Sequence, residues 1–371
     1  MVSPSVESNC RRVGGELAFR IGLSVAGLVI GLAVVEIGLR LFVPVCEMPF
    51  VRYLDDYQIL SYDPTLKTEG IYTAGPRSQV RGRWRINNAG WNSSIDYVPS
   101  KILPRIAIVG DSYVEAFQVD VEDSFPELLR ERLKGQYEVY QFGMSGATLP
   151  GYLRMSRYVA RNFDPEVIVV VVSHNDFIGS LASGMVASVR SKIKIDGGRA
   201  VEVAPAAYRP NPIRRLLSRS ALIRFCVLNR RFERQWKPSS PRSRWDGGAP
   251  TTEAERWEQV DRMLEYVLSR MVQENPNRRI VVVHDGDRRA IYQGEGSSID
   301  RVHWGESIKT LAKKLSFKYL DLHGPMESWF ESNGRTFNSM HDYHWNETGH
   351  AFVAEQLVNQ LLHSEAPSVI P

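Results

Sequence analysis

Three residues far apart in the chain have the side chains needed for nucleophilic catalysis: Ser112, Asp342 and His344. Ser112 follows the apolar run 106–109, which predicts a buried strand that ends just before the serine. Asp342 and His344 are two residues apart, so their side chains point the same way in an extended loop. The carboxylate can then bind one ring nitrogen and leave the other free to accept the serine proton. Such a set can attack a carbonyl carbon.

The rest of the chain predicts a sheet that would hold these residues at one edge. Apolar, β-branched runs alternate with helical patterns: strands at 106–109, 137–142, 167–172, 280–283 and 318–320, and helices at 125–134, 152–162, 252–274, 304–315 and 349–362. This alternation predicts an α/β fold with a doubly wound, mostly parallel sheet. Such sheets bind ligands at the carboxyl ends of their strands, where Ser112 is expected.

Four short blocks of the sequence, in chain order, resemble those of the SGNH (GDSL-type) hydrolase superfamily, in a membrane-anchored bacterial form. The blocks are Gly110-Asp111-Ser112, the glycine of Phe142-Gly143-Met144, the asparagine of His174-Asn175-Asp176, and Asp342 with His344. The resemblance covers about residues 80–362. It implies a three-layer α/β/α, flavodoxin-like fold and ester chemistry at the serine.

The resemblance also implies a role for each matching residue. Ser112 would be the nucleophile, His344 the base, and Asp342 the residue that orients the histidine. The backbone N–H groups of Ser112 and Gly143 and the side-chain amide of Asn175 would form the oxyanion hole. Loss of one such donor typically raises the barrier by about 3–4 kcal/mol. No cofactor and no metal are implied; a metal held by His341, His344 and Asp342 is the alternative, but no further ligand cluster is evident.

Two features depart from the superfamily pattern. Ser173 stands where the asparagine block often begins with glycine, which affects backbone approach but leaves the amide donor in place. The terminal block is Asp342-x-His344 instead of Asp-x-x-His, a spacing that resembles SGNH-like proteins that O-acetylate extracellular polysaccharides and some membrane-anchored esterases. His341 is nearby, and His344 is favoured over it as the base. We expect Asp111 to bind loop amides and Asp176 to cap a helix.

The N-terminal part of the chain predicts a membrane anchor. Residues 1–20 are polar and contain three arginines, and residues 21–35 contain no charge. The segment 21–43 is long enough to cross a hydrocarbon core of about 30 Å, with Glu36 and Arg40 able to pair near the far interface. The arginines before it predict a cytoplasmic N-terminus and an extracytoplasmic, periplasmic catalytic domain on the inner membrane. A cleaved signal peptide and a buried core helix are the alternatives; no small-x-small cleavage site follows the apolar run.

The segments around the catalytic blocks have weaker patterns. Residues 44–100 are rich in glycine and proline, and we expect an irregular, membrane-proximal segment that packs on the main domain, residues 101–363. Residues 183–250 are expected to be an insertion with one helix near 213–236. Its arginines are expected to form a solvated basic face. A cap that attracts an anionic substrate or lipid headgroups is the alternative.

Composition excludes few classes of protein. A net charge of +4 over 371 residues gives no reason to expect nucleic-acid binding. The three cysteines, Cys10, Cys46 and Cys226, form no C-x-x-C pair, so a structural zinc site is not expected. Whether Cys46 and Cys226 form a disulfide stays open, because nothing in their spacing supports it.

We therefore expect a single-pass membrane-anchored serine esterase that removes acyl groups, above all acetyl, from a carbohydrate or lipid. An O-acyltransferase that modifies an extracellular polysaccharide would use the same residues, with a sugar hydroxyl replacing water. A non-catalytic scaffold that binds polysaccharide is a third hypothesis, and the presence of all four blocks argues against it.

Overall fold

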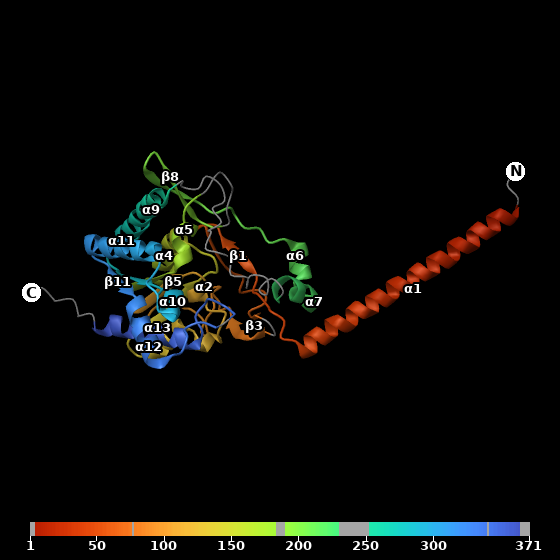
Figure 1. The fold of residues 1–371 in the computed structure, drawn as a ribbon, viewed down its shortest axis with the longest axis horizontal. Helices are drawn as coiled ribbons and strands as arrows, with labels where there is room; N and C mark the ends of the chain where they lie inside the picture. The colour runs from red at the N-terminus through yellow and green to blue at the C-terminus, as the bar shows by residue number, and fades with distance from the viewer. Residues whose placement is uncertain (1–3, 76–77, 183–189, 230–251, 340, 364–371) are drawn as a thin grey trace, which may run out of the picture.

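The computed structural model describes residues 4–75, 78–182, 190–229, 252–339 and 341–363. A long N-terminal helix projects from a layered α/β domain (Figure 1). The central sheet has five parallel strands in the order β11-β10-β7-β5-β6. They are β5 (Arg105–Gly110), β6 (Glu138–Gly143), β7 (Val167–Val172), β10 (Arg279–His284) and β11 (Lys318–Asp321). The predicted α/β fold with a mostly parallel sheet is confirmed.

The strand order places the switch in winding direction beside Ser112. From β5 the chain moves to β6 on one side, and it then returns to β7 on the other side of β5. Loops after β5 and β7 therefore lead in opposite directions and leave a crevice between them. Ser112 follows β5 and Asn175 follows β7, so both lie at this crevice edge.

Strand residues point alternately into two hydrophobic cores, one on each face of the sheet. Ala107 and Val109 of β5 pack into one core, whereas Ile106 and Ile108 pack into the other. The first core is covered by α4 (Leu149–Phe163), α9 (Glu253–Gln273) and α11 (Ile299–Leu315). The second is covered by α3 (Phe125–Arg132), α10 (Arg288–Gln293), α12 (His323–Asn333) and α13 (Glu347–His363). Both faces of β5 and β7 are buried, which explains their unbroken apolar sequences.

The membrane-proximal segment contains regular strands, which corrects the expectation of an irregular one. Two antiparallel hairpins pair β1 (Val51–Leu54) with β2 (Ile59–Tyr62) and β3 (Glu69–Ala74) with β4 (Val80–Arg85). Buried and exposed side chains alternate strictly along most of β4, as in a strand with one face on a core. Aromatic side chains of the hairpins pack against Phe117 of the main domain. The one glycine and the three arginines in β4 mask this alternation in the sequence.

The insertion differs from the single helix expected near 213–236. It contains α6 (Pro212–Leu217), α7 (Ala221–Arg224) and a π-helical turn, η3 (Phe225–Asn229); residues 230–236 lie outside the described part. The helix is interrupted because the side chain of Ser220 accepts a hydrogen bond from the N–H of Ile223 and so begins a new helix. A hairpin of β8 (Lys192–Asp196) and β9 (Arg199–Val203) was not anticipated.

The N-terminal helix α1 runs from Pro4 to Phe42. Its part from Phe19 to Phe42 is long and apolar enough to cross a membrane, and its side chains do not pack on the domain over most of that length. Glu36 and Arg40 form the expected ion pair, at 2.7 Å. Cys46 is a buried free thiol and Cys226 an exposed one, so the two do not form a disulfide.

Candidate active site

Ser112 begins the four-residue helix α2 (Ser112–Glu115) directly after β5. The turn into this helix requires Gly110, because a Cβ there would lie 2.4 Å from the side chain of Val114. Asp111 caps α2, and its carboxylate accepts a hydrogen bond from the N–H of Tyr113 at 2.9 Å, as expected. The strand and the cap together hold Ser112 at the carboxyl edge of the sheet.

His344 and Asp342 come to Ser112 from the loop before α13. The Nε2 atom of His344 lies 2.7 Å from Oγ of Ser112. On the other side of the ring, Nδ1 is hydrogen bonded to Oδ1 of Asp342, and the same oxygen accepts the backbone N–H of His344 at 2.9 Å. The three side chains thus form a continuous line from carboxylate through imidazole to hydroxyl, the arrangement that activates a serine for attack.

The charge of Asp342 sets the protonation behaviour of this line. Burial alone would lower the pKa of His344, but the Asp342 carboxylate offsets this and leaves the pKa raised. Burial acts in the opposite direction on Asp342 and would raise its pKa. The charge and hydrogen bonds of His344 outweigh burial, so the pKa of Asp342 lies below its usual value. The pair therefore favours a charged carboxylate beside a histidine that can hold a proton.

His341 does not occupy the position of His344. Its Cβ lies against the turn at Gly75, where an added glycine Cβ would come within 2.8 Å of it. The imidazole that reaches the serine is that of His344. Among the described residues, no group of three His, Cys, Asp or Glu side chains is arranged to hold a metal ion.

Asn175 lies in the first turn of α5 (His174–Gly179), at the carboxyl end of β7. The hydroxyl of Ser173 lies 3.5 Å from Oδ2 of Asp111, which ties this loop to the nucleophile loop. Ser173 is the N-cap of α5, and its N–H donates to Asp176 at 2.7 Å, so Asp176 takes part in capping this helix as the N3 residue of a capping box. Asn175 is exposed, and no hydrogen bond to its amide is recorded among the described residues. Its part in an oxyanion hole stays a prediction.

Gly143 lacks a side chain for a reason of packing. A Cβ there would lie 2.1 Å from the backbone nitrogen of the last residue of α2. Just after β6 the N–H of Met144 donates to the carbonyl of Gly110 of β5 at 3.1 Å, and within β6 the N–H of Gln141 donates to a tyrosine hydroxyl on the other side. N–H groups alternate along a strand, so that of Gly143 points away from β5. Its role as an oxyanion donor stays a prediction.

A buried arginine holds the catalytic loop from behind, and sequence reasoning did not single it out. Arg288, in α10, donates to the carbonyl of Tyr343 and to the hydroxyl of Tyr113. It also forms a buried ion pair with Asp285 at 3.0 Å. The hydroxyl of Tyr113 donates to the same carbonyl of Tyr343 at 3.2 Å, one residue before His344. These contacts fix the backbone from which the imidazole projects.

Two further residues link the membrane-proximal segment to the site. The hydroxyl of Tyr72, in β3, donates to Oδ2 of Asp342 at 3.4 Å. The carboxylate of Glu115 accepts hydrogen bonds from the hydroxyl of Tyr62 and from the N–H of Ser145, the latter at 2.8 Å. Burial raises the pKa of Glu115 to about 7, although these hydrogen bonds oppose the rise. No spacing rule could have found such contacts, because they join residues far apart in the chain.

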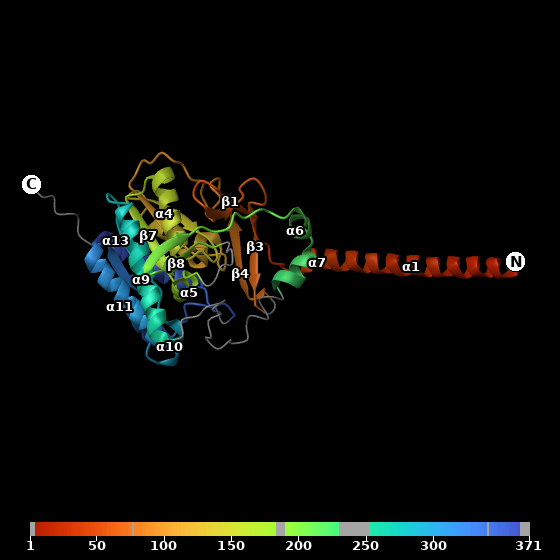
Figure 2. The same cartoon turned by 90° about the horizontal axis from the view of Figure 1, so that it is seen from above.

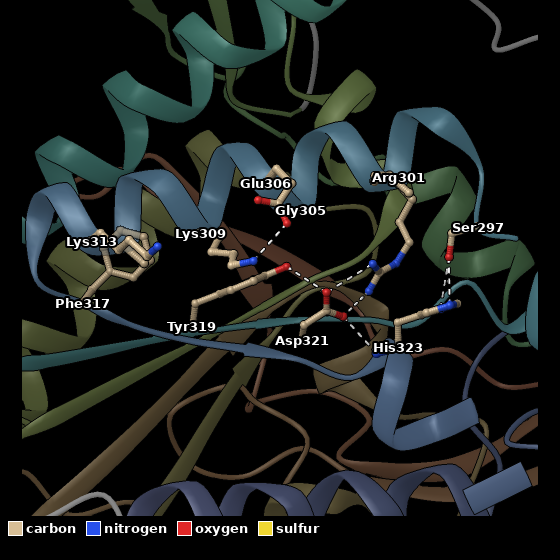
Figure 3. A pocket seen from close by; sticks show the side chains of 12 residues that line it. Ser297, Arg301, Gly305, Glu306, Lys309, Lys313, Phe317, Tyr319, Asp321 and His323 are labelled. Carbon is tan, nitrogen blue, oxygen red and sulfur yellow. Dashed lines mark hydrogen bonds and ion pairs between the residues drawn. The ribbon is translucent and has the colours of Figure 1, made fainter. Parts of the chain in front are cut away.

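An open hollow of about 540 Å³ lies elsewhere, between α11 and the edge strand β11 (Figure 3). Figure 3 shows that its charged side chains are largely paired with one another: Arg301 with Asp321, and Lys309 with Glu306. None of Ser112, Asp342 and His344 lines it. The candidate active site, formed by Ser112, His344 and Asp342 at the carboxyl end of β5, is thus separate from this hollow.

Comparison with known families assigns the fold and the chemistry together. Residues 108–352 match the model of the GDSL-like lipase/acylhydrolase family, which covers more than half of the chain. The chain belongs to this family. It is thus an ester-hydrolysing enzyme of the SGNH hydrolase superfamily, as the four sequence blocks predicted. No curated protein matches the chain.

Solved structures of similar fold include several esterases. An acetyl xylan esterase, AlAXEase, is 17% identical and covers 69% of this chain and 99% of its own, with a TM-score of 0.44. TesA is 13% identical and covers 70% of this chain and 98% of its own, with a TM-score of 0.40. A lipase/acylhydrolase from Enterococcus faecalis is 11% identical and covers 71% of this chain and 98% of its own, with a TM-score of 0.40.

Proposed function

We propose that the hydrolase cleaves esters through an acyl-enzyme on Ser112, with His344 as the general base and Asp342 as the residue that orients it. The observation that carries this proposal is the unbroken hydrogen-bonded line from Asp342 through His344 to Oγ of Ser112. A scaffold that only bound polysaccharide would have no need of a serine hydroxyl 2.7 Å from an oriented imidazole.

In the first half-reaction, Oγ of Ser112 attacks the ester carbonyl carbon while Nε2 of His344 takes the hydroxyl proton. The carbonyl oxygen becomes an anion, and the tetrahedral species collapses as the histidine returns the proton to the leaving alcohol. The negative charge of Asp342 stabilises the imidazolium that exists between these two events.

The oxyanion requires hydrogen-bond donors that are already in place. The side-chain amide of Asn175 and the backbone N–H of Ser112 are the donors we propose at the crevice edge, with Gly143 as the third predicted donor. The same loop offers an alternative in Gly146, at a φ of +75°, whose N–H has no recorded acceptor among the described residues. Gly143→Ala would drive a methyl group into the backbone of α2, so it tests packing more than catalysis.

In the second half-reaction, His344 deprotonates an acceptor that attacks the acyl-enzyme and releases the serine. With water as acceptor the protein is an esterase, and we propose acetyl esters of a carbohydrate or lipid as its substrates. With a sugar hydroxyl as acceptor it would be an O-acyltransferase. The spacing of Asp342 and His344 resembles that of polysaccharide O-acetylating proteins as well as that of some membrane-anchored esterases, so it is compatible with this second candidate and does not separate it from the first.

We propose that α1 anchors the enzyme in the inner membrane with the N-terminus in the cytoplasm. The apolar length of Phe19–Phe42 supports a spanning helix, and Arg11, Arg12 and Arg20 before it support that orientation. The catalytic domain would then act on the periplasmic side.

The experiment compares the full-length chain in detergent with its Ser112→Ala and Asn175→Ala variants, using p-nitrophenyl acetate. We expect steady turnover that Ser112→Ala abolishes and that Asn175→Ala lowers by about 100-fold or more in kcat. A serine-dependent burst that then stalls would favour the acyltransferase. Turnover that survives Ser112→Ala would overturn the serine mechanism. Circular dichroism of each variant shows whether the fold is retained.

A further inference from the structure

The insertion helix α7 and the turn before it pack directly on the end of the N-terminal helix. Figures 1 and 2 both place α6 and α7 on the side of the domain from which α1 leaves. The carboxylate of Glu36 accepts the N–H groups of Ala221 and Leu222, at 2.9 and 2.8 Å, and the hydroxyl of Ser220 at 2.8 Å. Arg40 donates to the carbonyl of Arg219 at 2.7 Å. A carboxylate in an otherwise apolar segment is thus satisfied by the first turn of α7.

The position of these contacts along α1 fixes the depth of α7 relative to a bilayer. The apolar segment ends at Phe42, so Glu36 lies six residues, or about 9 Å, from its end at 1.5 Å per residue. Its 24 residues extend over about 36 Å, compared with a hydrocarbon core of about 30 Å. With a core of about 30 Å placed anywhere along this segment, Glu36 lies about 3–9 Å inside the core boundary, so α7 lies at the boundary between acyl chains and headgroups.

The exposed side chains of this region combine apolar and basic groups. Ile213, Leu216 and Val227 are 68%, 64% and 55% exposed, which is unusual for such residues grouped on neighbouring short elements. Arg214 and Arg219 are exposed between them. Residues 205–229 contain five arginines and no acidic residue. We call the exposed side chains of Ile213, Arg214, Leu216, Arg219 and Val227 the juxtamembrane surface.

We propose that the juxtamembrane surface binds the bilayer in which α1 is anchored, with its apolar side chains at the acyl boundary and its arginines on anionic phospholipid headgroups. The proposal rests on the membrane anchor proposed above. Apolar side chains of this kind insert at an interface while arginine heads remain among phosphates. Each basic side chain near an anionic leaflet adds attraction that salt screens.

This surface is continuous with the active site through the hairpin segment. Asn229, which ends η3, accepts the N–H of Cys46 at 3.1 Å and donates to the hydroxyl of Thr73 at 3.1 Å. Thr73 is next to Tyr72, whose hydroxyl contacts Asp342. Bilayer contact at α6 and α7 would therefore set the orientation and height of the catalytic crevice above the membrane, which α1 alone could not do.

The test uses the full-length chain in nanodiscs with an environment-sensitive fluorophore on one cysteine. In a Cys10→Ser background the native exposed Cys226 is labelled, since Cys46 is buried. A second protein carries the label at Leu216→Cys, with Cys226→Ser. Control labels are placed at Val302→Cys, exposed on α11, and at Leu32→Cys in α1. The discs contain phosphatidylcholine with doxyl-quencher lipids, with or without one third phosphatidylglycerol.

We expect the labels at positions 216 and 226 to be quenched at least twofold more strongly than the label at 302, and more strongly with phosphatidylglycerol than without. The pair Arg214→Gln and Arg219→Gln should remove the phosphatidylglycerol effect, whereas the distant pair Arg199→Gln and Arg289→Gln should retain it. Circular dichroism checks that each variant is folded.

The controls separate failure of this proposal from failure of the anchor. Quenching at position 32 but not at 216 and 226 would leave the anchor in place and overturn the lipid-binding surface. No quenching at position 32 would overturn both. Quenching at 216 and 226 that is indifferent to phosphatidylglycerol would overturn the anionic-headgroup part of the proposal.

Discussion

The hydroxyl of Tyr72 donates a hydrogen bond to Oδ2 of Asp342 at 3.4 Å, from a strand that lies outside the residues matched by the family model. The other oxygen of that carboxylate faces His344. Both oxygens of the carboxylate are therefore held, one by the catalytic histidine and one by the membrane-proximal hairpin. A segment added to the family domain thus contacts the charge on which the histidine depends.

Tyr72→Phe should lower kcat/KM for p-nitrophenyl acetate by roughly 2- to 10-fold, because it removes one long hydrogen bond to the charged Asp342 carboxylate while keeping the ring. The matched control is Tyr53→Phe in β1, whose hydroxyl lies 3.4 Å from the carbonyl of Pro205. That control should match the wild type. Equal kinetics for the two variants would mean that the Tyr72 contact does not position Asp342.

Asp342→Asn should lower kcat by about 1,000-fold or more, since the imidazole loses the charge that orients it and stabilises its protonated form. The base must be neutral to act, so wild-type activity should fall as the pH drops through the raised pKa of His344, above its ordinary 6.5. In the variant the Asp342 charge no longer offsets the lowering of the His344 pKa by burial, so the acidic limb should move to lower pH. Steady-state rates from pH 4 to 9 measure both effects. An acidic limb that does not move would show that the charge of Asp342 does not set the pKa of His344.

Arg288→Lys should lower kcat by roughly 10- to 100-fold with little change in KM, because one ammonium cannot replace a guanidinium that bridges three acceptors. The loss would arise from a loosened Tyr343 carbonyl and a displaced imidazole. The neighbouring Arg289→Lys is the control, since Arg289 is exposed and bonds only to Gln293 among the described contacts. A rise in KM without a change in kcat would indicate a role in substrate binding instead.

Glu115→Gln should make the fold less sensitive to pH. Burial raises the pKa of Glu115 to about 7, so the wild-type contribution is full below the unfolded value of 4.5 and is lost as the pH rises to about 7. The variant has no carboxyl group to titrate. Its free energy of unfolding minus that of the wild type should therefore rise by up to about 3 kcal/mol between pH 4 and pH 8. Urea unfolding of the full chain at pH 4 and pH 8 tests this. Glu122→Gln, at an exposed site, should show no such difference.

The sequence predicted the sheet because parallel strands that are buried on both faces have unbroken apolar sequences. The run at Val167–Val172 has the same bounds in the structure, and the other predicted strands agree to within a residue or two at each end. The hairpins at residues 51–85 were missed, because a short one-sided strand such as β4, with arginines on its outer face and a glycine on its buried face, resembles loop sequence. The insertion helix was predicted too long, because its break depends on Ser220 and on a carboxylate from α1.

By itself, the sequence determined the fold class and the types of side chain that could do the chemistry, since both depend on local patterns of apolar and reactive residues. Only the tertiary structure decided which histidine meets Ser112, and that Arg288 and Tyr72 hold the catalytic loop. These contacts join residues from separate elements, some more than 200 positions apart. Their geometry depends on how the layers pack, and no spacing within a single element specifies it.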